Sequence, residues 1–193
     1  WARGLGDVYK RQLRARDVFE DLGEKGALAF TTYNLGVVET NADRLDEAEG
    51  YLLEARSGLA ELGAQVHMAD CDYALAWLAS RRGRFAEAID GLEKARETYT
   101  DRAQKPSGPP LCDLDLAEIY LRLDARWDAA QHARRAEESF SRIGLELERE
   151  AARLRLAGAV ARAGEVPQAV RRLASSAKRF RELSNEPMAA LCD

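Results

Sequence analysis

The chain has 193 residues, of which 46% are hydrophobic and 32% are charged. Its 29 basic and 33 acidic side chains give a net charge of −4, which provides neither the footprint of a nucleic-acid-binding protein nor a basic patch for a membrane. The apolar stretches fall short of the roughly 20 residues that a membrane helix needs, and no charged-then-apolar leader opens the chain. We therefore expect a soluble protein without nucleic-acid or membrane partners.

Residues 1–12 are the first segment in chain order, and they do not fit the pattern that fills the rest. Val8 stands where that pattern requires a small residue, and Gly4 and Gly6 weaken a helix. The string GLGDVYKRQ also resembles translated adapter sequence at the ends of some metagenomic reading frames. We interpret 1–12 as an artefact or a disordered segment and exclude it from the fold.

From residue 13 onward, one helical pattern recurs about every 40 residues, a spacing typical of helical repeat proteins. Each copy has a small anchor residue, an apolar or small residue one turn later and another alanine two turns later. A unit that cannot bury its own apolar face must stack on its neighbours, so the pattern predicts an all-α solenoid of antiparallel helix pairs. The anchors are Ala48, Ala88, Ala129 and Ala169.

Glycines mark the breaks between the paired helices. Gly83 and Gly164 can adopt the left-handed conformation that ends a helix. The expected elements are the second helix of a truncated repeat at 13–28, repeats at 29–68, 69–109, 110–149 and 150–189, and the start of a further repeat at 190–193. Because the chain begins with Trp1 and stops inside this pattern, we expect it to be a fragment of a longer protein.

A proline-rich stretch, residues 105–110, follows repeat two. The interval across it, from Ala88 to Ala129, is only one residue longer than the interval from Ala48 to Ala88. We expect a turn rather than a domain boundary, since proline is tolerated at the start of a helix. In repeat three the turn also differs, because Trp127 stands one place later than Phe85 does in repeat two.

Repeat two resembles the tetratricopeptide repeat (TPR) signature at Leu75-Ala76, Gly83, Phe85 to Ile89 and Ala95. All four repeats fit this signature, over about residues 29–189. Their period exceeds the usual one of about 34 residues, which implies helices lengthened by about a turn. The resemblance implies a right-handed superhelix that binds its partners on a concave face lined by first helices.

A narrower resemblance rests on residues 111–121, LCDLDLAEIYL, followed by Ala129, Ala133, Ala136 and Phe140. This segment is similar to the repeats that precede the caspase-like peptidase domain of bacterial CHAT proteins. Similar long repeats occur in bacterial signal-transducing ATPase regulators and transcriptional activators. The catalytic His and Cys of the CHAT family lie in its C-terminal domain, so the resemblance transfers no catalytic residue to this chain.

The cysteines at first suggest a metal site, because His67 and Cys71 are four residues apart on one predicted helix. However, Cys71, Cys112 and Cys192 occupy the same position of their respective repeats, and each precedes an aspartate. Thr31 and Ala152 fill that position elsewhere. We interpret the position as a slot for small buried residues and expect no metal and no cofactor. The odd number of cysteines favours a reducing compartment, the cytoplasm.

Acid–base catalysis is not expected either. The chain has only two histidines and no recognisable Ser/His/Asp constellation. Its abundant carboxylates therefore have no partner group that would activate them as a general acid or base. Glycines such as Gly83 and Gly164 are expected in helix-terminal turns, and the sequence has no Gly-rich phosphate-binding loop. We therefore expect the chain not to be an enzyme.

The repeat frame places one side chain per helical turn of each first helix on the expected concave face. Tyr73 and Trp77 are candidate anchors for a partner, since aromatic residues dominate binding hot spots; alternatively, they pack between helices. Arg81 recurs in register in later repeats and could form a ladder that contacts carbonyls or carboxylates of an extended peptide. The alternative is that these arginines cap helix C-termini. The positions are Tyr33, Val37, Asn41, Tyr73, Trp77, Arg81, Leu114, Glu118, Arg122, Leu154, Gly158 and Arg162.

Together these features predict a protein-protein interaction arm of a bacterial protein, with a protein or peptide as its partner. The CHAT resemblance implies a scaffold or sensor ahead of a peptidase domain. The alternative is the ligand-sensing repeat region of a transcriptional regulator or a signal-transducing ATPase. The oligomeric state stays open.

Overall fold

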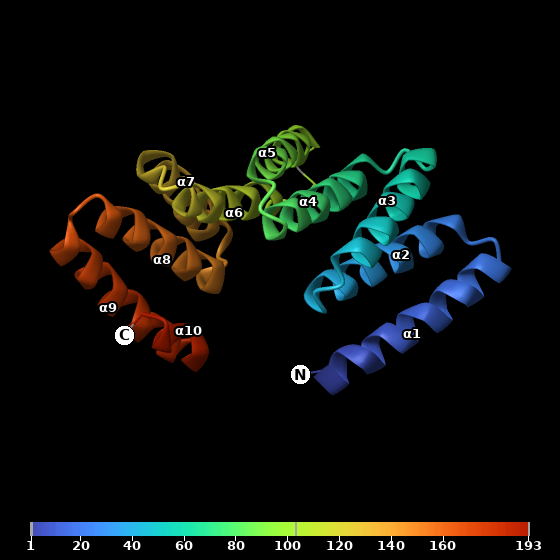
Figure 1. Cartoon of the computed structure of the whole chain (residues 1–193), viewed down its shortest axis with the longest axis horizontal. Helices are drawn as coiled ribbons and strands as arrows, with labels where there is room; N and C mark the ends of the chain where they lie inside the picture. Colours follow the sequence, from blue (N-terminus) through green and yellow to red (C-terminus); the bar gives the residue numbers. More distant parts are fainter. Residues whose placement is uncertain (1, 103, 193) are drawn as a thin grey trace. The chain divides into compact units, whose positions relative to one another are not determined.

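The structure is a computed structural model that describes residues 2–102 and 104–192. Over these residues the chain forms ten α-helices in tandem and no strand (Figure 1). The helices are α1 (Ala2–Asp21), α2 (Lys25–Asn41), α3 (Leu45–Glu61), α4 (Gln65–Arg81), α5 (Phe85–Arg102), α6 (Gly108–Arg122), α7 (Arg126–Ile143), α8 (Glu146–Arg162), α9 (Val166–Glu182) and α10 (Glu186–Ala190). The predicted all-α architecture of tandem helix pairs is confirmed.

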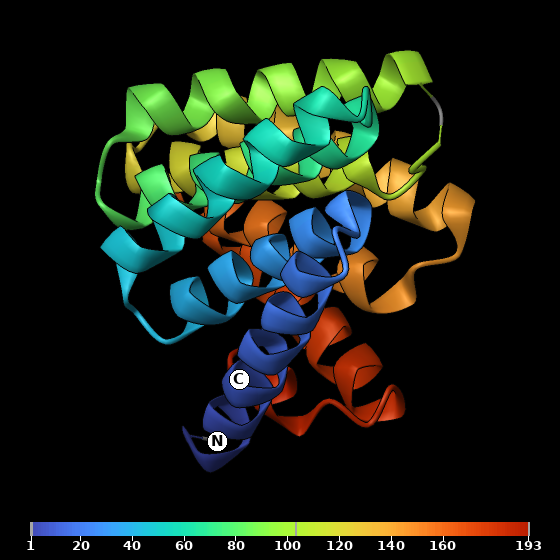
Figure 2. The same cartoon turned by 90° about the vertical axis from the view of Figure 1, so that its right-hand side faces the viewer.

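The helices form two compact units, residues 1–98 and 99–193, and the boundary falls within α5. In the first unit α2 packs against α1, α3 and α4, and the neighbouring helices run antiparallel (Figure 2). In the second unit α8 packs against α6, α7 and α9. Each unit therefore contains its own stack of helices.

Left-handed residues produce the sharp turns between helices. Gly83 and Gly164 have φ of 75° and 88°, as expected from their place in the repeat. The corresponding turns of repeats one and three use Asp43 and Asp124, with φ of 63° and 55°. Aspartate is among the few residues other than glycine that tolerate this conformation.

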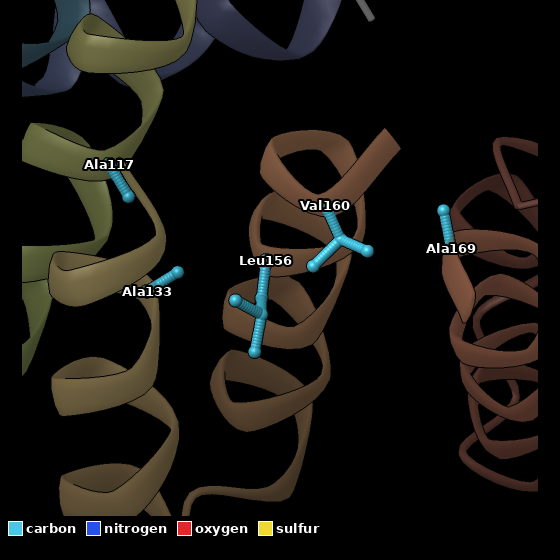
Figure 3. Packing of buried hydrophobic residues seen from close by; sticks show 5 residues of the cluster. All are labelled: Ala117, Ala133, Leu156, Val160 and Ala169. Carbon is cyan, nitrogen blue, oxygen red and sulfur yellow. The ribbon is translucent and has the colours of Figure 1, made fainter. Parts of the chain in front are cut away.

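The core consists of the small anchor positions and the large side chains beside them. Ala48, Ala88, Ala129 and Ala169 are all at most 2% exposed, so their predicted burial is confirmed. Figure 3 shows one cluster of the second unit, in which side chains of α6, α7, α8 and α9 face one another. Its members are Ala117, Ala133, Leu156, Val160 and Ala169.

Helix boundaries differ from the expected ones by about one turn. First helices begin at Lys25, Gln65, Gly108 and Glu146, before the repeat boundaries drawn from the apolar pattern. The physical reason is that the first turns of α2 and α4 begin with exposed polar residues, which give no periodic signal. Likewise α1 ends at Asp21 rather than near residue 28, and the residues from Lys25 onward belong to α2.

The N-terminal segment is helical from Ala2 onward, not disordered. Tyr9, within this segment, lies under the Arg44 guanidinium at 5.6 Å from its ring centre. Hydrogen bonding to Tyr51, together with burial and the charge of Glu39, raises the pKa of Tyr9 to about 12. Residue 1 lies outside the described residues. That residues 1–12 are translated adapter sequence stays a prediction.

None of the helices described here is both long and apolar enough to cross a bilayer.

Candidate partner-binding groove

First helices of consecutive repeats, α2 and α4, lie side by side in the first unit. A groove of about 190 Å³ opens between them. Five of its lining residues are ones that the repeat frame places on the expected binding face. The lining consists of Tyr33, Val37, Thr40 and Asn41 from α2 and Tyr73, Ala74 and Trp77 from α4.

Helical geometry explains why these side chains meet. Tyr33, Val37 and Asn41 are spaced by four residues and therefore share one face of α2. Tyr73 and Trp77 have the same relation on α4. Leu35 on the other side of α2, and Leu78 one turn after Ala74 on α4, are fully buried and hold the helices in place.

The aromatic side chains of the groove are half-buried, so they combine a fixed position with an accessible surface. Tyr33 packs against two core clusters, one around Ala55 and Leu59 and one around Leu52. Burial, with smaller contributions from the charges of Asp70 and Cys71, raises the pKa of Tyr33 to about 12. Its hydroxyl is therefore harder to ionise than that of an exposed tyrosine.

Arg81 lies next to the groove and is held by three contacts. Its guanidinium stands 5.1 Å from the ring centre of Trp77, and its Nη2 lies 2.8 Å from Asp43 Oδ1. Its Nη1 also donates to the carbonyl oxygen of Thr40 at 3.4 Å. Thr40 is in the last turn of α2, and its carbonyl oxygen also accepts from the Asp43 N–H at 3.2 Å, so Arg81 adds a second donor to a C-terminal helix carbonyl. This contact resembles the helix-capping role considered for Arg81 above, except that Arg81 belongs to α4 and the carbonyl belongs to α2.

The predicted residues of the second unit have other surroundings. Leu114 and Leu154 pack against buried clusters around Phe140 and Phe180, respectively. Glu118 pairs with Arg155 at 3.2 Å.

The other three predicted positions of this unit are Arg122, Gly158 and Arg162. Arg122 and Arg162 are exposed in the last turns of α6 and α8, and the methyl groups of Leu121 lie close to Gly158. The structure thus brings together the predicted residues of repeats one and two, and the arginine ladder stays a prediction.

The cysteine slot is a packing position. Cys71 and Cys112 are fully buried and Cys192 is 7% exposed, while Thr31 and Ala152 are also buried. Burial and the nearby Asp72 and Asp70 raise the pKa of Cys71 to about 12, which disfavours the reactive thiolate.

His67 does not share this environment. It is exposed and contacts the edge of Phe30, with ring centres 4.6 Å apart. Among residues 2–102 and 104–192, no group of three or more His, Cys, Asp or Glu side chains is arranged to hold a metal ion.

A buried acid and histidine pair is the feature that the sequence did not predict. His132 Nδ1 lies 2.7 Å from Asp113 Oδ1, with the Tyr120 ring stacked on the imidazole and Arg135 beside it. The side chains of His132 and Asp113 are 7% and 8% exposed. A general base must reach its substrate, so we interpret this pair as a structural link between α6 and α7. The only sequence signal was the aspartate that follows the cysteine slot.

No family model matches the chain, and no curated protein matches it by sequence. Solved structures do match its fold. The chain is similar to a signal-transduction ATPase with a TPR sensor from Pyrococcus horikoshii, with a TM-score of 0.75 and 15% identity over 87% of this chain and 26% of that one. It thus spans about a quarter of that protein.

Two further matches are TPR-like proteins. A Rap protein complexed with Competence and Sporulation Factor has a TM-score of 0.70 and 16% identity over 95% of this chain and 55% of that one. The nearly identical TPR-like repeats of a putative kinesin light chain from Podospora anserina have a TM-score of 0.70 and 14% identity, over 93% and 88% of the two chains. The fold is therefore that of a TPR-like repeat solenoid.

Proposed function

We propose that the chain is a protein-interaction arm whose groove between α2 and α4 binds an extended segment of a partner protein. The observation that carries the proposal is that five residues from two repeats, selected by their repeat position, line one groove. A groove of about 190 Å³ suits a side chain of a partner rather than a folded domain.

The chemistry of the lining supports a peptide ligand. Tyr33, Tyr73 and Trp77 provide large surfaces that lose little entropy on binding. Asn41 can pair with a peptide backbone, because its amide both donates and accepts hydrogen bonds. A protein with a similar fold, the Rap protein, is described in complex with Competence and Sporulation Factor. The proposal gives the chain no catalytic role and needs no cofactor.

Peptide selection tests this function. Peptides that are displayed on phage and enriched on the purified chain should lose at least about tenfold in affinity when Trp77 is replaced by alanine, which is typical of a hot-spot aromatic residue. Fluorescence anisotropy with a labelled selected peptide gives the affinity. The matched control is Trp127→Ala, since Trp127 is 71% exposed and lies in the other unit.

Two results would contradict the proposal. In the first, Trp77→Ala and Trp127→Ala weaken binding equally. In the second, Trp77→Ala lowers the helical signal in circular dichroism, which would identify Trp77 as a core residue.

We further propose that the arm serves as a scaffold or sensor ahead of a caspase-like CHAT peptidase domain, in a cytoplasmic bacterial protein. The support is the resemblance of residues 111–121 and the alanines that follow. The alternative is the sensor of a signal-transducing ATPase, and the similarity to the Pyrococcus horikoshii protein favours it. The reading frame beyond Asp193 separates the two: a caspase-like domain with a His and Cys pair supports the first, whereas an ATPase or helix-turn-helix domain overturns it.

A further inference from the structure

A second groove, of about 450 Å³, lies between α2 and α3 in the first unit. It shares no lining residue with the groove between α2 and α4. Small or short side chains leave it open along its floor, and charged side chains form its rim. The lining consists of Lys25, Leu28, Ala29, Thr32, Glu54, Ser57, Gly58 and Glu61.

One side chain in this groove is unsatisfied. Thr32 is 1% exposed, and its Oγ1 has no hydrogen-bond partner among the residues that the structure describes. By contrast, Thr31 and Thr40 on the same helix donate to the carbonyl oxygens four residues before them. A buried hydroxyl without a partner is destabilising, so its position in a groove points to a ligand.

The equivalent place in repeat four shows what such a groove can hold. There the positions of Leu28, Thr32 and Gly58 carry three arginines, Arg149, Arg153 and Arg179. Two of them connect α8 and α9, since Arg153 donates to Ser175 and Arg179 donates to Glu146.

Carboxylates bind these guanidinium groups. Glu150 is fully buried and accepts from Arg149 at 3.1 Å and from Arg153 at 3.0 Å. Glu182 accepts from Arg179 at 2.7 Å, and Ser176 donates to Glu150 at 3.0 Å. This part of the fold therefore accommodates guanidinium groups when carboxylates and a hydroxyl are present to receive them.

Repeat one lacks the three arginines and keeps only part of the acceptor set, because Ala29, Ala55 and Lys25 stand at the positions of Glu150, Ser176 and Glu146. Glu61 occupies the position of Glu182 and pairs with Lys25 at 3.4 Å, and the Glu61 and Lys25 side chains are 65% and 73% exposed. An exposed pair of this kind is worth little, and a carboxylate has room for further donors.

Glu54 is the second acceptor on the rim, paired with Arg16 at 2.8 Å. Burial lowers the pKa of Arg16, but the hydrogen bond and charge of Glu54 and the charge of Glu20 outweigh it and raise the pKa. Glu54 is therefore an acceptor already engaged by one cation, as Glu61 is by Lys25.

We propose that the groove between α2 and α3 binds an arginine side chain of a partner polypeptide. Leu28 and Ala29 contact the methylene groups of the arginine, and the guanidinium donates to Glu61, Glu54 and Thr32 Oγ1. Arginine suits this place better than lysine because its planar group donates to several acceptors at once.

The test is an NMR titration of the ¹⁵N-labelled chain with N-acetyl-arginine amide, compared with the capped citrulline analogue, which has nearly the same shape and no charge. The expected result is saturable shifts confined to residues 25–32 and 54–61, with at least about tenfold weaker binding of citrulline. Equal binding of the two probes, or shifts spread over the chain, would overturn the proposal.

Three variants sharpen the test. Thr32→Val keeps the shape and removes the hydroxyl, and Glu61→Gln removes one charge; each should weaken binding of capped arginine at least about threefold. Glu47→Gln, an exposed carboxylate at the other end of α3, is the matched control and should have no effect. Equal losses of affinity for capped arginine in Glu47→Gln and Glu61→Gln would show that carboxylates attract the probe non-specifically, and would overturn the proposed site.

Free arginine distinguishes a polypeptide from a metabolite. Its charged amino and carboxylate groups are absent from an arginine within a chain, so the capped probe should bind at least as tightly. If free arginine bound about tenfold more tightly than the capped probe, the polypeptide partner would be overturned.

Discussion

Tyr33 shows how one side chain serves both the core and the candidate binding face. It packs on two core clusters and lines the groove between α2 and α4. Its spacing from Val37 predicts the shared face, but not its burial or its raised pKa. Those depend on Leu52 and Asp70, which come from other helices.

The raised pKa of Tyr33 makes a prediction about stability at high pH. Below the usual pKa of 10.0 both the folded and unfolded states keep the proton, and the full stability is present. As pH rises toward 12, the unfolded state loses the proton first, and stability falls. Urea unfolding between pH 9 and 11.5 should show a shallower loss for Tyr33→Phe than for the parent chain. Parallel curves would contradict the burial of this hydroxyl.

Gly36 gives a second prediction at the same scale. The other repeats carry alanine at this position, so the sequence alone suggests that alanine is tolerated. In the structure, however, a Cβ at Gly36 would lie 2.7 Å from Leu52 Cγ and 3.3 Å from the Ala48 carbonyl. Gly36→Ala should therefore lower the free energy of unfolding by about 1–3 kcal/mol.

The control for Gly36 is Gly50→Ala on α3, where an added Cβ meets nothing within 4 Å. Alanine there should stabilise by about 0.5–1 kcal/mol through helix propensity alone. Equal effects in the two variants, measured by urea unfolding, would rule out the close approach of α2 and α3.

Pairs of helices are joined by ion pairs whose polarity changes along the chain. Arg56 of α3 binds Asp72 of α4 through two contacts, of 2.5 and 3.2 Å. At the same repeat positions in the second unit, Glu137 of α7 faces Arg153 of α8 at 3.6 Å. The charges are exchanged, but the contact between helices is kept, so these positions are coupled within each stack.

This coupling can be measured with a double-mutant cycle. Arg56→Glu places two carboxylates opposite each other, and Asp72→Arg places two cations, so each single variant should be destabilised. The double variant restores the pair in the polarity seen at Glu137 and Arg153, and should recover about 0.5–1 kcal/mol, because both groups are partly exposed. Strictly additive losses in thermal or urea unfolding would show that the two positions are not coupled.

At the scale of the whole molecule, the sequence predicts what depends on periodicity and misses what depends on contacts between helices. The anchors around Ala48 and the turn at Gly83 follow from the repeat and are confirmed. Helix starts are missed because polar first turns have no apolar period. The contact between Asp113 and His132, 19 residues apart on different helices, leaves no recognisable spacing in the sequence.

Of the two candidate grooves, one could be predicted from the sequence and the other could not. Repeat position brings five predicted residues to the groove between α2 and α4. The groove between α2 and α3 arises instead from what is missing at Thr32 and Gly58, where repeat four has arginines. Only the packed structure shows that these short side chains leave space.

The most direct test of the account is the location of a bound peptide. A peptide selected on the chain, titrated into ¹⁵N-labelled protein, should shift amides near Tyr33, Val37, Asn41, Tyr73 and Trp77 before any others. Shifts confined to residues 99–193, or equally large over both units, would contradict the claim that the groove between α2 and α4 is the partner-binding site.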